Sequence, residues 1–203
     1  FGTAFLFVFL PWQVADPGSK AYVGVGAFNL VRVEAYRRAG GHAALPMDVV
    51  DDVKLGKRLR EGGARQECGF SDGRVRVRWA VGLKGMIDGL TKNMFASLGF
   101  RLAPTLSAVF RILLLVVWPG LGLTVGPWGA RLLCAGALAA MVWTVGVIRP
   151  VPRASALHGL AFPLAGLLMS YIILRSAVRT YRQGGVVWRG TLYPLAELRK
   201  GVV

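Results

Sequence analysis

Three long stretches without a charged side chain most constrain what this chain can fold into. They cover residues 112–130, 132–148 and 154–174, which are 19, 17 and 21 residues long. A helix that crosses the roughly 30 Å hydrocarbon core of a bilayer needs about 20 apolar residues, and about 17 is the lower limit. Apolar runs of this length rarely form the buried helices of a soluble core, so we interpret all three as candidate membrane spans.

The composition agrees with a membrane protein and excludes several soluble classes. The 203 residues carry a formal net charge of +15, although 54% of them are hydrophobic. That apolar content excludes a disordered basic tail, and a nucleic-acid-binding protein would give no reason for the uncharged stretches. Two cysteines provide neither a disulfide framework nor a zinc cluster. We therefore expect membrane lipids, and no nucleic acid, as partners of this chain.

The membrane region is expected to cover residues 104–178 and to contain two or three spans. Proline and repeated glycine follow Trp118, which predicts a kinked span or a re-entrant turn in the first stretch. Three crossings would leave the basic tail at 179–203 on the outer side, against the tendency of Lys and Arg to stay inside. We therefore favour two crossings and a cytosolic tail, with residues 82–103 as an amphipathic linker helix at the interface.

Residues 1–81 have the pattern of a small α/β domain. Strands are predicted at 21–32, 64–70 and 74–79, and helices at 34–39 and Asp51–Glu61. Two glycines, Gly24 and Gly26, would let another segment approach the first strand closely. In the second helix Leu55 and Leu59 share one face, through which we expect this helix to pack on a sheet.

The paired carboxylates Asp51 and Asp52 are the first candidates for chemistry. At a helix start they are either capping groups that interact favourably with the helix dipole, or one of them is a general base. His42, which follows two glycines, is either a turn residue or a donor of a proton or a hydrogen bond. The alternating arginines at 74, 76 and 78 form either a solvated strand face or a surface that recognises anions.

The order of the motifs is more informative than any one of them. The motifs Gly24-Val-Gly-Ala-Phe-Asn-Leu30, Tyr36…Gly40-Gly-His42, Val50-Asp-Asp-Val-Lys-Leu-Gly56 and Val77-Arg-Trp79 follow one another and precede the membrane spans. This series resembles the acceptor-side half of a family 2 glycosyltransferase of the GT-A fold. It is most similar to the membrane-bound subgroup that acts on lipid or cell-envelope acceptors and includes ceramide-glucosyltransferase-like and hopanoid-associated enzymes. Two later segments, at 89–96 and 187–193, are similar to the same subgroup.

The resemblance implies an inverting transfer of a sugar from a nucleotide sugar to an acceptor hydroxyl. Asp52 would be the base that deprotonates the acceptor, with Asp51 as its structural neighbour. Arg78 and Trp79 would end the Gln/Arg-x-x-Arg-Trp motif that helps to hold the donor diphosphate and the acceptor. Because Val75 occupies the first position of that motif, a processive polysaccharide synthase is less expected.

Further substrate-binding residues follow from the same resemblance. Gly26, Phe28, Asn29 and His42 would line the pocket for acceptor and donor, and Lys92, Asn93, Trp188, Arg189 and Tyr193 would add contacts. The resemblance implies a multi-pass protein of a bacterial-type inner (cytoplasmic) membrane, with its soluble part in the cytosol. Its substrates would be the nucleotide sugar and a lipid or envelope acceptor.

One part of the family pattern has no counterpart in this sequence. The family carries an earlier nucleotide-binding half, with an Asp-x-Asp that holds a divalent metal, Mg²⁺ or Mn²⁺, on the diphosphate. No Asp-x-Asp occurs here, so we expect the metal in the complete enzyme, with ligands that are absent from this chain. The chain would then be a carboxy-terminal portion, inactive without the missing amino-terminal half. The alternative is a non-catalytic integral membrane component, such as a transport or assembly subunit.

Overall fold

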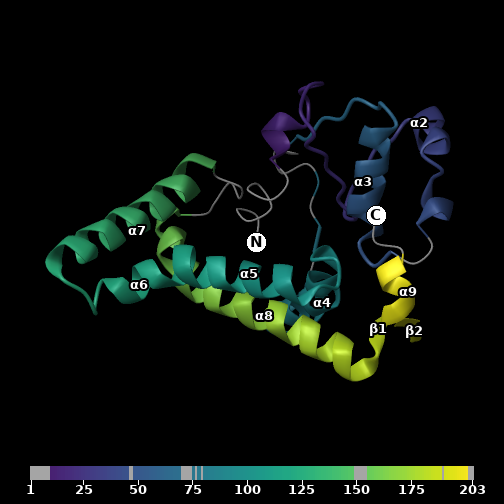
Figure 1. Cartoon of the computed structure of the whole chain (residues 1–203). Helices are drawn as coiled ribbons and strands as arrows, with labels where there is room; N and C mark the ends of the chain where they lie inside the picture. The colour runs from purple at the N-terminus through teal and green to yellow at the C-terminus, as the bar shows by residue number, and fades with distance from the viewer. Residues whose placement is uncertain are drawn as a thin grey trace. The chain divides into compact units, whose positions relative to one another are not determined.

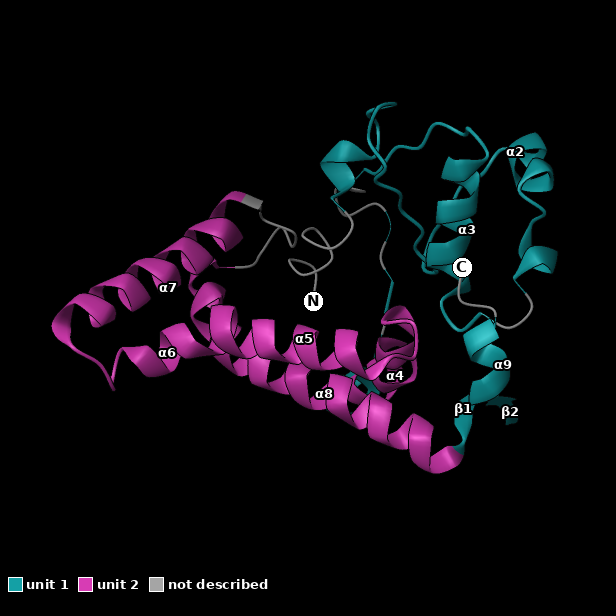
Figure 2. Cartoon of the chain, in the orientation of Figure 1, with its two compact units in different colours: residues 1–86, 184–203 teal, residues 87–183 magenta. Residues whose placement is uncertain are grey.

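The computed structural model describes residues 10–200 with the exception of 46–47, 70–74, 76, 79, 149–154 and 189, and of the side chain of Ile148. The chain is mostly helical and divides into two compact units (Figures 1 and 2). Unit 1 consists of residues 1–86 and 184–203, and unit 2 consists of residues 87–183.

Unit 1 begins with short helices joined by irregular chain. They are the 3₁₀ turn Pro11–Gln13 (η1), α2 at Val33–Arg38, the 3₁₀ turn His42–Ala44 (η2) and α3 at Asp51–Glu61. Both helices predicted for this region are therefore confirmed, with α2 shifted by one residue. Acidic residues in the first turn of α3, and Arg58 and Arg60 in its last turn, suit the two ends of the helix dipole.

A small apolar core joins α2, η2 and α3. Its buried members are Ala39, Leu45, Leu55 and Leu59. Leu55 and Leu59 lie one turn apart on α3, so the predicted packing face of this helix is confirmed. That face packs on α2 and on the η2 turn rather than on a sheet.

The strand predicted at 21–32 is wrong. The chain there is irregular and turns at residues 26–27. A strand needs a neighbouring strand to pair its backbone groups. Here side chains do so instead, because Gln66 Oε1 accepts from Val23 N–H at 3.2 Å and Asn29 Oδ1 accepts from Val25 N–H at 3.1 Å.

The two other predicted strands are not seen either. Residues 64–69 are irregular. In the last predicted strand, positions 74, 76 and 79 lie outside the described residues, and Val75, Val77 and Arg78 are described and are not in a strand. Among the residues that are described, strands occur only at β1 (Gly185–Trp188) and β2 (Thr191–Pro194). The described part of unit 1 therefore contains a two-stranded sheet, and the predicted α/β domain of the GT-A type is not seen in it.

The two strands form a hairpin near the carboxy terminus, which we did not predict from the sequence. β1 and β2 pair antiparallel, with Val186 opposite Tyr193 and Trp188 opposite Thr191. Gly190 has a φ of +83°, which suits the tight connection between them. The helix α9 (Leu195–Lys200) follows and packs against both strands.

Unit 2 is built from helices. They are α4 at Gly82–Ser97, whose first residues belong to unit 1, α5 at Leu102–Ile112, a π-helical turn at Leu113–Val117 (η3), α6 at Trp118–Gly122, α7 at Trp128–Ile148, the 3₁₀ helix Ala156–Ala161 (η4) and α8 at Phe162–Gln183. A helix forms in the predicted linker at 82–103; its location at a membrane interface stays a prediction.

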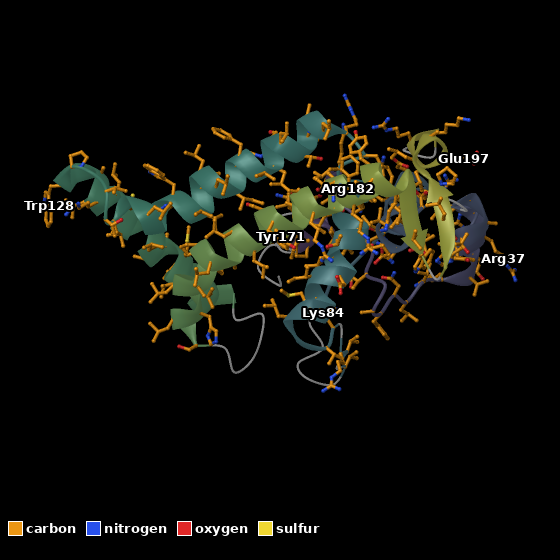
Figure 3. The ribbon with its side chains drawn as sticks, turned by 90° about the horizontal axis from the view of Figure 1, so that it is seen from below. Arg37, Lys84, Trp128, Tyr171, Arg182 and Glu197 are labelled. Carbon is orange, nitrogen blue, oxygen red and sulfur yellow. The ribbon has the colours of Figure 1, made fainter. Side chains whose placement is uncertain are left out.

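Three segments of unit 2 are long and apolar enough to cross a membrane. They are Leu102–Gly122, Trp128–Val147 and Ala156–Gln183. At most 28% of the residues in their most apolar windows are buried within the chain. The side chains that project from the helices between Trp128 and Tyr171 are predominantly carbon (Figure 3). Such extended apolar surface is what a membrane protein presents to lipid, so these segments support the predicted membrane region.

The first candidate span differs from the uncharged stretch that predicted it. It begins ten residues earlier, at Leu102, and therefore includes Arg111. The helix passes through Pro119 to Gly122 and then turns at residues 123–127. Because Pro119 has no N–H and its ring crowds the preceding turn, a wider turn before it is expected, and a π-helical turn is present there.

The helix α8 runs antiparallel to the segment formed by α5 and α6. Gly166 of α8 faces Val116 and Val117, and an added Cβ would lie 3.0 Å from either side chain. Gly120 likewise lies against Pro163. At the opposite end Phe95 of α4 has its ring centroid 5.5 Å from that of Tyr181 in α8. Small residues permit this close helix packing, and the start of α5 and the end of α8 lie at the same end of unit 2 (Figure 1).

Candidate functional site

A pocket of about 780 Å³ lies within unit 1, between the irregular chain after Val23 and the helices α2 and α3. It brings together six of the residues proposed from the sequence, which are Gly26, Phe28, Asn29, His42, Asp51 and Asp52. These residues come from three separate motifs. Their convergence therefore depends on the tertiary structure.

The Asp52 carboxylate is oriented by two backbone N–H groups. Its Oδ2 accepts from Gly26 N–H at 2.6 Å, and its Oδ1 accepts from Val53 N–H at 2.8 Å. Asp52 also lies in the first turn of α3, where the helix dipole favours negative charge. Each oxygen keeps a further lone pair, so the carboxylate is able to accept another hydrogen bond or a proton from a molecule in the pocket.

Glycines let the irregular chain lie directly on α3. A Cβ at Gly26 would lie 2.9 Å from Oδ2 of Asp52. A Cβ at Gly24 would overlap the Asp52 carbonyl, and one at Gly56 would overlap the Val23 carbonyl. The close approach predicted at Gly24 and Gly26 is therefore confirmed, and the element that approaches is α3.

Two long side chains hold the irregular chain in this position. The Arg60 guanidinium donates to the carbonyl oxygens of Val14 at 3.1 Å, of Ser19 at 2.6 Å and of Asp16. Gln66 accepts from Val23 N–H and donates to the Gly56 carbonyl at 2.6 Å. Side chains thus replace the missing strand partners on this side of the pocket.

The loop from Val25 to Asn29 forms one wall of the pocket. Phe28 N–H donates to the Val25 carbonyl at 3.1 Å, and Asn29 closes the same turn through Val25 N–H. The turn leaves apolar side chains outside, with Phe28 exposed by 62% and Leu30 by 90%. The pocket therefore combines carboxylates with an exposed apolar wall.

His42 is held by Tyr36, a residue of the same sequence motif to which we assigned no role from the sequence. The Tyr36 hydroxyl accepts from His42 N–H at 3.0 Å and lies 2.7 Å from Nδ1 of the same residue. Gly41, with φ of +53°, brings the two together, since a Cβ there would lie 2.6 Å from the tyrosine ring. With a neutral imidazole we expect the hydroxyl to donate to Nδ1, which leaves the proton on Nε2. The sequence signal that could have identified this partner is a tyrosine six residues before the histidine, on the other side of a Gly-Gly pair.

Those of the remaining proposed residues that the structure describes do not line the pocket. Arg78 is exposed, and Trp79 and Arg189 lie outside the described residues. Trp188 and Tyr193 belong to the hairpin of unit 1, with ring centroids 6.2 Å apart. Lys92 and Asn93 belong to α4 in unit 2, where the Asn93 side-chain oxygen is buried and has no hydrogen-bond partner among the described residues.

The described residues provide no metal-binding cluster, and the described cysteines do not line the pocket. Across the described ranges, no three His, Cys, Asp or Glu side chains come together in a way that could hold a metal ion. The residues that are described therefore do not fit a Mg²⁺ or Mn²⁺ site. Burial raises the pKa of the Cys68 thiol, which reduces its thiolate fraction at neutral pH and makes it a poor nucleophile.

Comparisons with protein-family models, with curated proteins and with solved structures found no match.

Proposed function

We propose that this chain provides the acceptor-binding part of an inverting, GT-A-type glycosyltransferase that works at a membrane, with Asp52 as the general base. The observation that carries this proposal is the orientation of the Asp52 carboxylate by Gly26 N–H and Val53 N–H in a pocket shared with His42. The order of the sequence motifs supports the same function, because those motifs supply the residues of this pocket.

The proposed reaction is a single displacement. The acceptor hydroxyl gives its proton to Asp52 while its oxygen forms a bond to the anomeric carbon of the nucleotide sugar. The bond between that carbon and the diphosphate oxygen breaks, and the nucleoside diphosphate leaves with the electron pair. Attack from the face opposite the leaving group inverts the configuration. Asp51, the neighbour of the base, lines the same pocket.

The surroundings of the pocket favour an acceptor with an apolar part. Phe28, Leu30 and Val33 line the pocket and are all more than half exposed. Such side chains would contact the hydrocarbon portion of a lipid acceptor while its hydroxyl reaches Asp52. The three candidate spans of unit 2 would keep the site close to a membrane in which such an acceptor is dissolved.

The proposal also assigns an orientation and a missing part. Unit 1 would face the cytosol at a bacterial-type inner membrane, where nucleotide sugars are available. The donor would bind an amino-terminal half that this chain does not contain. A divalent cation on the donor diphosphate would be held by that half, since the described residues offer no fitting ligand set.

The test replaces the two neighbouring carboxylates one at a time. Asp52→Asn and Asp51→Asn are compared in membranes that contain the full chain together with any upstream segment of its natural protein. The readout is transfer of labelled sugar from a nucleotide sugar to extracted lipid. Loss of a general base lowers the rate by about 10²–10⁴-fold, so we expect this loss for Asp52→Asn and most of the rate to remain for Asp51→Asn. Undiminished transfer by Asp52→Asn would refute the proposal.

The second candidate function is a non-catalytic membrane component. It is favoured by the fact that both Asp52 oxygens already accept backbone hydrogen bonds, as they would in a tether between the loop and α3. In that case Asp52→Asn would lower the thermal stability of the protein, because an asparagine has only one acceptor oxygen, and it would leave function intact.

A further inference from the structure

Three helices meet at one end of unit 2. There Phe95 of α4 packs against Phe100, just before α5, with ring centroids 5.6 Å apart, and against Tyr181 near the end of α8. The other end is marked by the contact of Gly120 with Pro163. We call the first end the basic end, and define it by Arg101, Arg179 and Arg182.

The positive charges of the basic end exceed the negative charge available to them. Asp88 is the only acidic residue of the sequence between positions 87 and 183. Arg175 forms an ion pair with Asp88, with Nη2 at 2.9 Å from Oδ1. Arg101, Arg179 and Arg182 are exposed, and their guanidinium groups form no hydrogen bond or ion pair with the residues that the structure describes. These three guanidinium groups are therefore available to a ligand.

The opposite end of the α5–α8 pair differs in its chemistry. Arg131 folds over the turn at 123–127, where Nε donates to the Gly126 carbonyl at 2.9 Å and Nη2 to the Thr124 carbonyl at 3.5 Å. Trp118 and Trp128 are exposed beside this turn, as aromatic residues often are at a membrane interface. The Arg131 guanidinium is thus hydrogen-bonded to backbone, whereas those of the basic end form no hydrogen bond within the described part of the chain.

The surface next to the arginines is apolar. Arg179 and Arg182 lie on one face of α8, and Val178 and Tyr181 beside them are 50% and 41% exposed. Leu102, which follows Arg101, is 50% exposed. A ligand that matches this surface carries phosphate on one side and hydrocarbon on the other. A soluble phosphate would leave the apolar part without a partner.

We propose that the basic end is a binding surface for an anionic phospholipid, whose phosphate contacts Arg101, Arg179 and Arg182 and whose acyl chains lie along Leu102 and Val178. This inference does not rest on the proposed transferase reaction. It holds for any function of unit 2 in a membrane.

The test measures lipid selectivity by electron paramagnetic resonance. The full chain is reconstituted in phosphatidylcholine vesicles that contain a trace of spin-labelled phosphatidylglycerol or spin-labelled phosphatidylcholine. We expect a larger immobilised fraction for phosphatidylglycerol at low ionic strength. Each arginine at an anionic surface is worth about fivefold in association, so Arg179→Gln/Arg182→Gln should remove most of the preference. Arg179→Lys/Arg182→Lys should retain it.

The matched control is Arg131→Gln, at the opposite end, which should leave the preference unchanged. Arg101→Gln on α5 provides an independent test if the double glutamine variant loses its helical circular dichroism. Equal association of both lipids with the unaltered chain would overturn the proposal, as would an equal loss in Arg131→Gln. Abolition of the preference by millimolar inorganic phosphate at constant ionic strength would also overturn it, because the site would then belong to a soluble anion.

Discussion

At the scale of single residues, the site depends on groups that orient the reactive side chains. Asp52 has its direction set by the backbone of Gly26, from a loop 26 positions earlier, and His42 has its ring held by Tyr36. A sequence pattern identifies a carboxylate pair or a histidine, but it does not identify these partners. Their effect is measurable because each removes a rotational freedom from a side chain that faces the pocket.

Tyr36→Phe tests the orientation of His42. We expect the variant to lose the single tautomer that Tyr36 imposes, and the free energy of unfolding to fall by about 1 kcal/mol because His42 N–H loses its acceptor. The measurement is ¹⁵N NMR of histidine-labelled full chain in micelles. The chain has two histidines, so His158→Gln assigns the signals.

The control for this prediction is Tyr171→Phe, which removes the hydroxyl of an exposed tyrosine on α8. It should leave the His42 signals unchanged. If Tyr36→Phe also leaves them unchanged, the hydroxyl does not set the tautomer.

At the scale of elements, glycine decides which segments of unit 1 touch. The chain at 21–26 lies on α3 because Gly24 and Gly56 leave room for the opposing backbone. The same chain is β-prone in composition, so its residues alone predict a strand. Tertiary contacts override that propensity: Gln66, Asn29 and Asp52 pair the N–H groups at 23, 25 and 26, which a sheet would otherwise pair.

Gly56→Ala is expected to destabilise unit 1. Its Cβ would overlap backbone, which cannot move aside as a flexible side chain can, so we expect a loss of about 1–3 kcal/mol. The matched control is Gly89→Ala, also within a helix, where no atom lies within 4 Å of the added Cβ. Replacing that glycine should raise helix stability by about 0.5–1 kcal/mol. Thermal unfolding followed by circular dichroism measures both, and equal effects would contradict the close approach.

At the scale of the whole molecule, the chain enters and leaves unit 2 at the same end of its helices. The antiparallel packing of α8 on α5 and α6 brings Leu102 and Gln183 to one end. The segments before and after unit 2 also belong to the same compact unit. We predict two crossings from this arrangement, made by the α5–α6 segment and α8 rather than with the first stretch re-entrant, and a basic tail on the side of residues 1–86.

Thiol labelling checks this topology. In a chain with Cys68→Ser and Cys134→Ala, single cysteines are introduced as Ser97→Cys, Glu197→Cys and Thr124→Cys. We expect an impermeant maleimide to reach the first two from the same side of sealed membranes and the third from the opposite side. Labelling of the Glu197→Cys and Ser97→Cys chains from different sides would contradict the antiparallel arrangement.

The sequence by itself determined the features that depend on local pattern. Helices at Asp51–Glu61 and near 34–39, the buried face of Leu55 and Leu59, and three candidate spans were predictable, because length, periodicity and charge act within one segment. The extension of the first span back to Leu102 was missed, since Arg111 interrupts its apolar run although the helix continues.

Only the tertiary structure decided how these segments meet. It joined Gly26, His42 and Asp52 in one pocket, replaced the strand expected at 21–32 by side-chain hydrogen bonds, and brought Arg101 to the same end as Arg179 and Arg182. The physical reason is that backbone pairing and close packing depend on groups distant in sequence. A β-prone segment without a strand partner satisfies its N–H groups wherever acceptors lie.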